Sequence, residues 1–276
     1  MPPLSPIPRR VLLALASAAA TSFAGCSYTG LPPSIWPPAN FALEIEELRF
    51  EGDLAHVVRR ARVDAQGVFV YGTASRHLVD AATGASLPVF DRLAVYQLEP
   101  ECLRALSRKV AGLVEGLQQG EPGEPSPTGV VLRWRAFDTE AAWSAQGRPR
   151  GRFHEVVKEL AGYLPKGEAF ATPVRGARRV LRGVPAPKQG AAAALAAYEQ
   201  VVELSEDDDE LLLDAFALAC DVGDRSAAER WLERWTEATA DERASAPAFR
   251  DGPPALSPAV LQRLLPPAAG PSGGGG

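Results

Sequence analysis

Hydrophobic and polar positions alternate along residues 41–50, the pattern of a β-strand with one buried face. Phe41, Leu43 and Ile45 are separated by small or acidic residues, and a period of two places them on the same side of a strand. The glutamates of this segment are expected to face solvent along a strand edge. The alternation shifts at Leu48, which predicts either a β-bulge or the end of the strand.

A β-hairpin is predicted over residues 57–71. Both of its arms contain β-branched residues, and Gly67 stands in the turn between them, where a positive φ is needed. The polar residues 73–86 are expected to form a loop. Apolar side chains dominate again in residues 93–98, which predict another strand.

Two amphipathic helices are predicted in the same half of the chain. Pro100 suits the first position of a helix, and residues 103–117 then place leucine and valine at intervals of three and four, which forms one apolar stripe. Residues 153–164 carry a second stripe. Between the helices, residues 130–136 and 141–145 read as two strands. This order predicts an α+β domain with a mainly antiparallel sheet and two helices.

The composition changes in the C-terminal part, where alanine, leucine and acidic residues predict an α-helical segment. Residues 209–240 resemble one tetratricopeptide repeat, with Gly223 and Asp224 in the turn and Ala228 at the small position where the two helices cross. Residues 191–206 resemble the second helix of a preceding repeat. A plain helical pair explains the same residues, and both interpretations stay open, because about three repeats are needed to bury a solenoid core.

The N-terminal stretch has the parts of a secretory signal peptide. Arg9 and Arg10 precede an uncharged apolar run that ends in small residues before Cys26, the order of a basic region, a hydrophobic region and a cleavage site. The run has about a dozen residues, whereas a membrane-spanning helix needs about 20, so the length disfavours a membrane-spanning anchor. The two arginines are also similar to a twin-arginine export signal, and the export route stays open.

The end of this stretch, Phe23-Ala24-Gly25-Cys26, resembles the lipobox of bacterial lipoproteins, although leucine is usual where Phe23 stands. The resemblance implies that the Cys26 thiol receives a diacylglycerol and that the chain is cut just before it. Two or three acyl chains hold a protein on a bilayer, because each buried CH₂ adds about 0.8 kcal/mol. Ser27, where aspartate is absent, resembles the sorting signal for the outer membrane, at its periplasmic face or the cell surface.

These patterns divide the chain into six parts. The parts are a signal peptide (1–25), a lipidated cysteine with a proline-rich tether (26–40), the α+β domain (41–166), a basic linker (167–190), the helical repeat-like segment (191–245) and a mostly disordered tail (246–276) that holds one short helix over 257–265.

The composition is that of a globular protein. Apolar residues make up 46% and charged residues 23% of the chain, and the formal net charge of −5 is too mild to predict a nucleic-acid partner. Cys102 and Cys220 are expected to be buried thiols, with a disulfide between them as the alternative. No cysteine and histidine spacing indicates a metal site, so no cofactor is predicted.

Candidate catalytic residues are few. His56, His77 and His154 are far apart in the sequence, and we interpret each as a surface or packing residue rather than as an acid–base group. The sequence contains no nucleophile elbow, zinc-peptidase motif or phosphate-binding loop. We therefore assign no catalytic residue.

The basic linker holds the one candidate binding site. Arg175, Arg178, Arg179 and Arg182 are predicted to contact an anionic membrane or glycan surface, where each basic residue contributes about 1 kcal/mol. Two other interpretations stay open: solvated loops, or an internal clamp on the acidic run over residues 199–210.

These observations favour a lipid-anchored protein of the bacterial cell envelope that acts as a non-enzymatic interaction module. The membrane is reached through Cys26, and the helical segment is expected to dock another envelope protein. One alternative is an envelope hydrolase whose site is assembled from distant residues such as His77, Asp91 and His154. Another is an accessory subunit whose basic linker binds an anionic envelope polymer.

Overall fold

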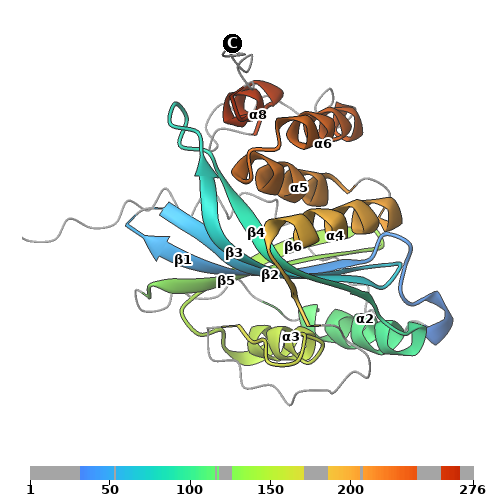
Figure 1. Ribbon diagram of the computed structural model, residues 1–276. Coiled ribbons are helices and arrows are strands. Elements are labelled where there is room, and N and C mark those ends of the chain that lie inside the picture. Colours follow the sequence, from blue (N-terminus) through green and yellow to red (C-terminus); the bar gives the residue numbers. More distant parts are fainter. Residues whose placement is uncertain are drawn as a thin grey trace, which may run out of the picture. The chain divides into compact units, whose positions relative to one another are not determined.

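The fold is α+β, as predicted, and divides into two compact units in the computed structural model (Figure 1). The first unit takes its residues from 1–73 and 93–188, and the second from 74–92 and 189–276. The structure describes residues 32–52, 54–115, 117, 126–170, 186–205, 208–240 and 256–267.

The sheet of the described residues has seven strands in the order β6-β5-β1-β2-β3-β4-β7. Strand β1 lies between β5 and β2, and it is antiparallel to both. The remaining printed pairs, β2 with β3 and β5 with β6, are antiparallel too. The strand bounds are β1 (Ala42–Glu51), β2 (Leu54–Asp64), β3 (Val68–Val79), β4 (Ser86–Gln97), β5 (Thr128–Ala136), β6 (Thr139–Gln146) and β7 (Lys188–Gln189).

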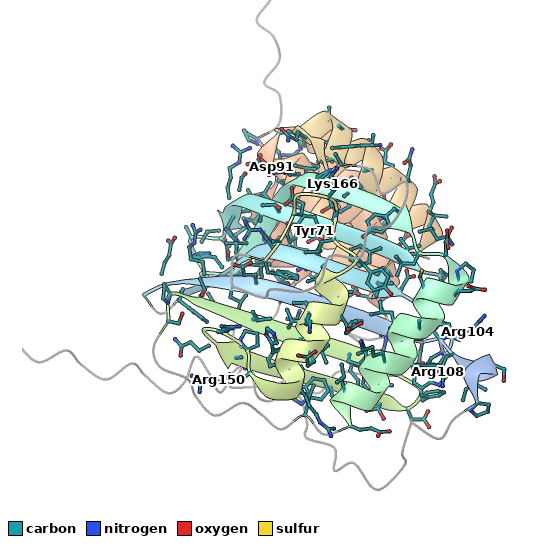
Figure 2. All side chains as sticks on the ribbon, turned by 90° about the horizontal axis from the view of Figure 1, so that it is seen from below. Tyr71, Asp91, Arg104, Arg108, Arg150 and Lys166 are labelled. Atoms are coloured by element: carbon teal, nitrogen blue, oxygen red, sulfur yellow. The ribbon has the colours of Figure 1, made fainter. Side chains whose placement is uncertain are left out.

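Helices α2 (Pro100–Val114) and α3 (Gly151–Ala161) cover one face of the first unit's sheet, as Figures 1 and 2 show. Pro100 is the first residue of α2, where the missing N–H would have no partner in any case. The predicted apolar stripes of both helices are buried against the odd-numbered side of β1. Fully buried members of this core are Leu43, Ile45, Ala61, Val63, Leu106, Val110, Leu132, Val156, Val157 and Leu160.

A β-bulge lies at the shift predicted in β1, but its extra residue is in the neighbouring strand β2. Glu47 is opposite Arg59, but the next residue, Leu48, is opposite Val57. Val58 is therefore an extra residue of β2 with no counterpart in β1. The strand does not end here, since β1 continues to Glu51 and pairs regularly with β5 through Arg49. A bulge is present as predicted, but Leu48 is apolar because both sides of β1 are buried from Leu43 to Leu48.

The loop predicted over residues 73–86 is wrong. Strand β3 continues to Val79, β4 starts at Ser86, and only six residues connect them. Half-buried and exposed positions prevail in β3 from Thr73 onward, so the segment has few apolar residues from which a strand can be recognised. Residues 74–92 belong to the second unit.

The second unit contains the helices of the C-terminal part. In Figure 1, α4, α5 and α6 lie side by side, and α8 contacts α6. Asp208, Asp224 and Ser257 cap α5, α6 and α8 by accepting backbone N–H groups of the first turn. Their bounds are α4 (Ala191–Leu204), α5 (Asp209–Asp221), α6 (Arg225–Ala238) and α8 (Pro258–Leu264).

Two ion pairs join the β3–β4 extension to these helices within the second unit. Asp80, only 5% exposed, receives two hydrogen bonds from the guanidinium of Arg263 in α8, at 3.1 and 2.7 Å. Arg76 in β3 lies 2.7 Å from Asp221 in α5. Among the described helices, none is long and apolar enough to cross a membrane.

Candidate functional site

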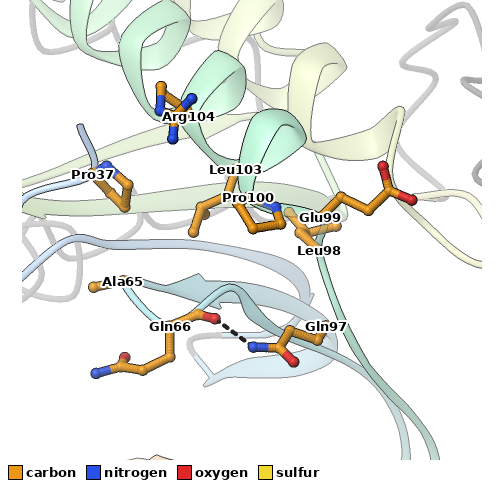
Figure 3. Close-up of a pocket in the computed structure, with 9 residues that line it drawn as sticks. All are labelled: Pro37, Ala65, Gln66, Gln97, Leu98, Glu99, Pro100, Leu103 and Arg104. Atoms are coloured by element: carbon orange, nitrogen blue, oxygen red, sulfur yellow. Dashed lines mark hydrogen bonds between the residues drawn. The ribbon is translucent and has the colours of Figure 1, made fainter. Parts of the chain in front are cut away.

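An open pocket of about 470 Å³ lies in the first unit, where the β2–β3 turn, the end of β4 and the start of α2 meet (Figure 3). Pro37, from the segment that precedes β1, forms part of its wall. The other lining residues are Ala65, Gln66, Gln97, Leu98, Glu99, Pro100, Leu103 and Arg104.

The predicted hairpin turn builds one side of this pocket. The carboxylate of Asp64 accepts the backbone N–H groups of Gln66 and Val68, both at 3.0 Å, which holds the turn closed. Gly67 has a φ of +80°, and a Cβ there would lie 3.2 Å from the carbonyl oxygen of Leu98. Glycine at this position therefore lets the turn approach the end of β4.

The pocket lining combines apolar, amide and charged groups. The Gln97 side chain donates to the carbonyl oxygen of Gln66 at 3.0 Å (Figure 3), so one of the two amides is held in place. Glu99 and Arg104, both exposed, supply one charge of each sign at the mouth. The lining contains no hydroxyl, thiol or imidazole group, and its one carboxylate is that of Glu99.

The glutamates of β1 do not face solvent, contrary to the prediction. Glu44, Glu46 and Glu47 are only 5%, 4% and 1% exposed. The strand is central in the sheet, between β5 and β2, so each glutamate has a neighbouring strand on both sides. Burial of a carboxylate is costly unless cations and hydrogen bonds compensate it.

Arginines from both neighbouring strands compensate Glu44 and Glu46. Arg60 of β2 donates to Glu46 at 3.0 and 2.8 Å and lies 3.7 Å from Glu44. Arg133 of β5 donates to Glu46 at 2.7 Å and to Glu44. The pairing register of the strands brings these side chains together, because Glu46 is opposite Arg60 and Glu44 is opposite Arg133. We name these four residues the sheet charge network.

The helix-covered side of the sheet holds a second polar group. Arg59 donates to Glu47 at 3.1 Å, and the hydroxyl of Tyr71 donates to Glu168 at 2.9 Å. Burial raises the pKa of Tyr71 to about 12, so its hydroxyl keeps its proton at neutral pH. Tyr71 therefore acts as a donor that fixes the segment following α3, near Lys166 in Figure 2.

The structure does not bring the histidines of the hydrolase alternative together in the pocket. His154 is half-buried on α3 in the first unit, whereas His77 and Asp91 lie on β3 and β4 in the second. Asp91 accepts a hydrogen bond from Ser75 at 2.8 Å. None of the three lines the pocket at α2.

The thiols are separate in the structure. Cys102 and Cys220 are both free, the first half-buried and the second buried. Burial raises the pKa of Cys220 to about 12, so the thiol is poorly reactive at neutral pH. In the described part of the chain, no three histidine, cysteine or acidic side chains are grouped as metal ligands.

Two predicted sites lie outside the described residues. These are the lipidation site, Cys26, and the arginine cluster of Arg175, Arg178, Arg179 and Arg182. Sequence reasoning missed the sheet charge network, although alternating acids in β1 and repeated arginines in the adjacent strands were a signal for it. The chain matches no protein-family model and no curated protein.

Proposed function

We propose that this chain is a lipid-anchored protein of the bacterial cell envelope that works as a non-enzymatic interaction module. The observation that carries the proposal is the order of a basic region, a short apolar run and the sequence Phe23-Ala24-Gly25-Cys26. The diacylglycerol would be attached at Cys26, and Ser27 favours the outer membrane.

The position of the first described element supports an anchor at this residue. The short helix η2 (Pro33–Ile35) begins seven residues after Cys26, and Trp36 directly behind it is 4% exposed. The ring of Trp36 packs edge-on against Phe137, with 5.3 Å between the centroids. A lipid at Cys26 would thus be joined to a firmly held point of the fold by a short piece of chain.

The helical part of the second unit supports the interaction role. Helices α5 and α6 form a hairpin with Gly223, at a φ of +77°, in its turn. Phe216 and Ala228 are fully buried, the positions at which a tetratricopeptide-like hairpin packs. We propose that this hairpin presents a docking surface to another envelope protein.

The experiment that tests the anchor compares the native protein with Cys26→Ser in a bacterial host. We expect the native protein to lose residues 1–25, to gain the mass of acyl chains and to be recovered with the membranes. The variant should keep its leader and gain no acyl mass. Native protein with an uncut N-terminus, recovered in the soluble fraction, would overturn the proposal.

The docking surface is tested separately with a photoreactive residue in place of Arg230 on α6, whose side chain is 59% exposed. A matched control carries the same residue at Arg49, exposed on β1. Position 230 should give one discrete cross-linked envelope protein, and position 49 should not. Equal products at both positions, or none at position 230, would contradict docking through α6.

A further inference from the structure

Exposed cations without ion-pair partners gather on α2 and at the start of α3. The other basic residues of these helices are already paired, Lys109 with Glu159 and Lys158 with Glu155. In residues 99–115 and 147–161 of the part of the chain that the structure describes, five exposed basic residues make no ion pair: Arg104, Arg108, Arg148, Arg150 and Arg152.

The positions of these cations are unfavourable within the chain itself. Arg104 and Arg108 are four residues apart on α2, a spacing at which like charges repel. Arg150 stands at the N-cap of α3 and Arg152 in its first turn, where the helix dipole disfavours positive charge. An external anionic partner would offset the repulsion between Arg104 and Arg108 and the unfavourable interaction of Arg150 and Arg152 with the helix dipole.

Few acidic residues oppose them. In the same two segments, the exposed acids are Glu99 and Glu101 at the start of α2, where negative charge suits the helix dipole. The side chain of Glu155 on α3 is 45% exposed, but it is paired with Lys158. The whole chain, by contrast, has a formal net charge of −5. The exposed face of α2 and α3 is thus positive on a mildly negative protein.

The N-terminal segment joins the fold beside this face. Pro37 and Arg104 line the same pocket (Figure 3), and Pro37 follows the buried Trp36. Cys26 precedes Trp36 by ten residues, which span at most about 35 Å when fully extended. A lipid at Cys26 therefore keeps Trp36 within that distance of the bilayer, and the next residue, Pro37, lines one pocket with the start of α2.

We propose that the face formed by α2, the start of α3 and their exposed arginines rests on the anionic headgroups of a phospholipid bilayer. The proposal depends on the anchor at Cys26 proposed above and adds an orientation to it. Figure 2 looks onto this face, with Arg104 and Arg108 along α2 and Arg150 beside α3. Cations spread over two helices match an extended layer of lipid phosphates rather than a single small anion.

The test uses the full lipidated protein reconstituted on two kinds of vesicle. One is phosphatidylcholine alone, and the other contains about one third phosphatidylglycerol, enough to give a negative surface potential. A fluorescent amino acid replaces Ala105, which is exposed next to Arg104 on α2, and the vesicles carry an energy-transfer acceptor in their headgroups. Energy transfer should be higher on the anionic vesicles and should fall as salt is added.

The charge-reversal variant R104E/R108E tests the residues directly. Each basic residue near an anionic surface strengthens association about five-fold. Reversing two arginines should therefore lower the ratio of protein whose arginine face lies on the bilayer to protein whose face is free, on the order of tenfold or more. The matched control R49E/R135E reverses two exposed arginines on β1 and β5 and should behave like the native protein. Thermal unfolding of both variants checks that the fold is intact.

The outcomes separate this proposal from that of the anchor. Protein that fails to float with phosphatidylcholine vesicles would show that the anchor is absent. Protein that floats with both vesicle types but gives equal energy transfer would overturn the orientation alone. So would a response of the fluorophore to soluble polyphosphate without a response to phosphatidylglycerol, because the partner would then be a polymer.

Discussion

The two sides of strand β1 are buried in different ways. Leu43 and Ile45 point into an apolar core beneath α2 and α3. On the other side, Glu44 and Glu46 are held by Arg60 of β2 and Arg133 of β5 in the sheet charge network. Apolar contacts are non-directional and tolerate repacking. A buried carboxylate requires each partner in place, since loss of one leaves an uncompensated charge. Strand β1 therefore depends on apolar packing on one side and on specific charged partners on the other.

The largest effect is expected on the apolar side. Ile45→Ala should lower the free energy of unfolding by about 3 kcal/mol, because Ile45 is fully buried and the variant leaves a cavity. The matched variant Ile45→Val should lose about 1 kcal/mol. Urea unfolding followed by circular dichroism measures both. Equal losses for the two variants would show that this side is loosely packed.

A smaller effect is expected on the charged side. Glu46→Gln should lower the free energy of unfolding by about 2 kcal/mol, below the value for a fully buried pair because Arg133 is 38% exposed. A double-mutant cycle of Glu46→Gln with Arg60→Gln should give a coupling of about 1 kcal/mol. Glu140→Gln, an exposed acid of the same sheet, is the control and should be neutral. Additive effects at positions 46 and 60 would contradict a shared network.

The smallest effect concerns an ion pair outside this strand. Hydrogen bonds from Arg263 hold the pKa of Asp80 well below its usual range. In the unfolded chain, the pKa of an aspartate is about 4. Because the pKa of Asp80 is lower in the folded protein, the pair stabilises the second unit at pH values above about 4, and this stability is lost as the pH falls further. The variant Asp80→Asn should therefore have a lower melting temperature than the native protein at pH 7. Between about pH 5 and 2, its melting temperature should fall less than that of the native protein.

The control for this experiment is Asp138→Asn, an exposed acid in the β5–β6 turn. Its pH profile should follow that of the native protein. If Asp80→Asn and the native protein lose stability in parallel on acidification, the Asp80–Arg263 pair contributes no pH dependence. Thermal unfolding by calorimetry distinguishes these results.

Local patterns were sufficient to predict much of the first unit. The stripe of α2 and the hairpin turn at Gly67 each depend on neighbours within a few residues. Burial of Glu44 and Glu46 could not be predicted in this way, because Arg133 is 89 and 87 residues away in the chain. The same holds for the pocket, which Pro37 and Arg104 line together although they are far apart in the sequence. Strand β3 beyond Thr73 was missed because its mostly polar residues carry little hydrophobic periodicity.

The extra residue of β2, Val58, has a consequence for how the length of this chain can vary. Arg59 and Ala61 lie on the helix side of the sheet, and Val57, beyond the bulge, lies opposite Leu48 on the other side. Removing Val58 would close the bulge and leave every side chain on its present face, because Val57 would simply become the next residue after Arg59 in a regular strand. Removing a residue between Arg59 and Val63 would exchange the two faces of the strand on one side of the cut. The bulge is thus a point in the central sheet where related chains can differ by one residue without changing which side chains are inside.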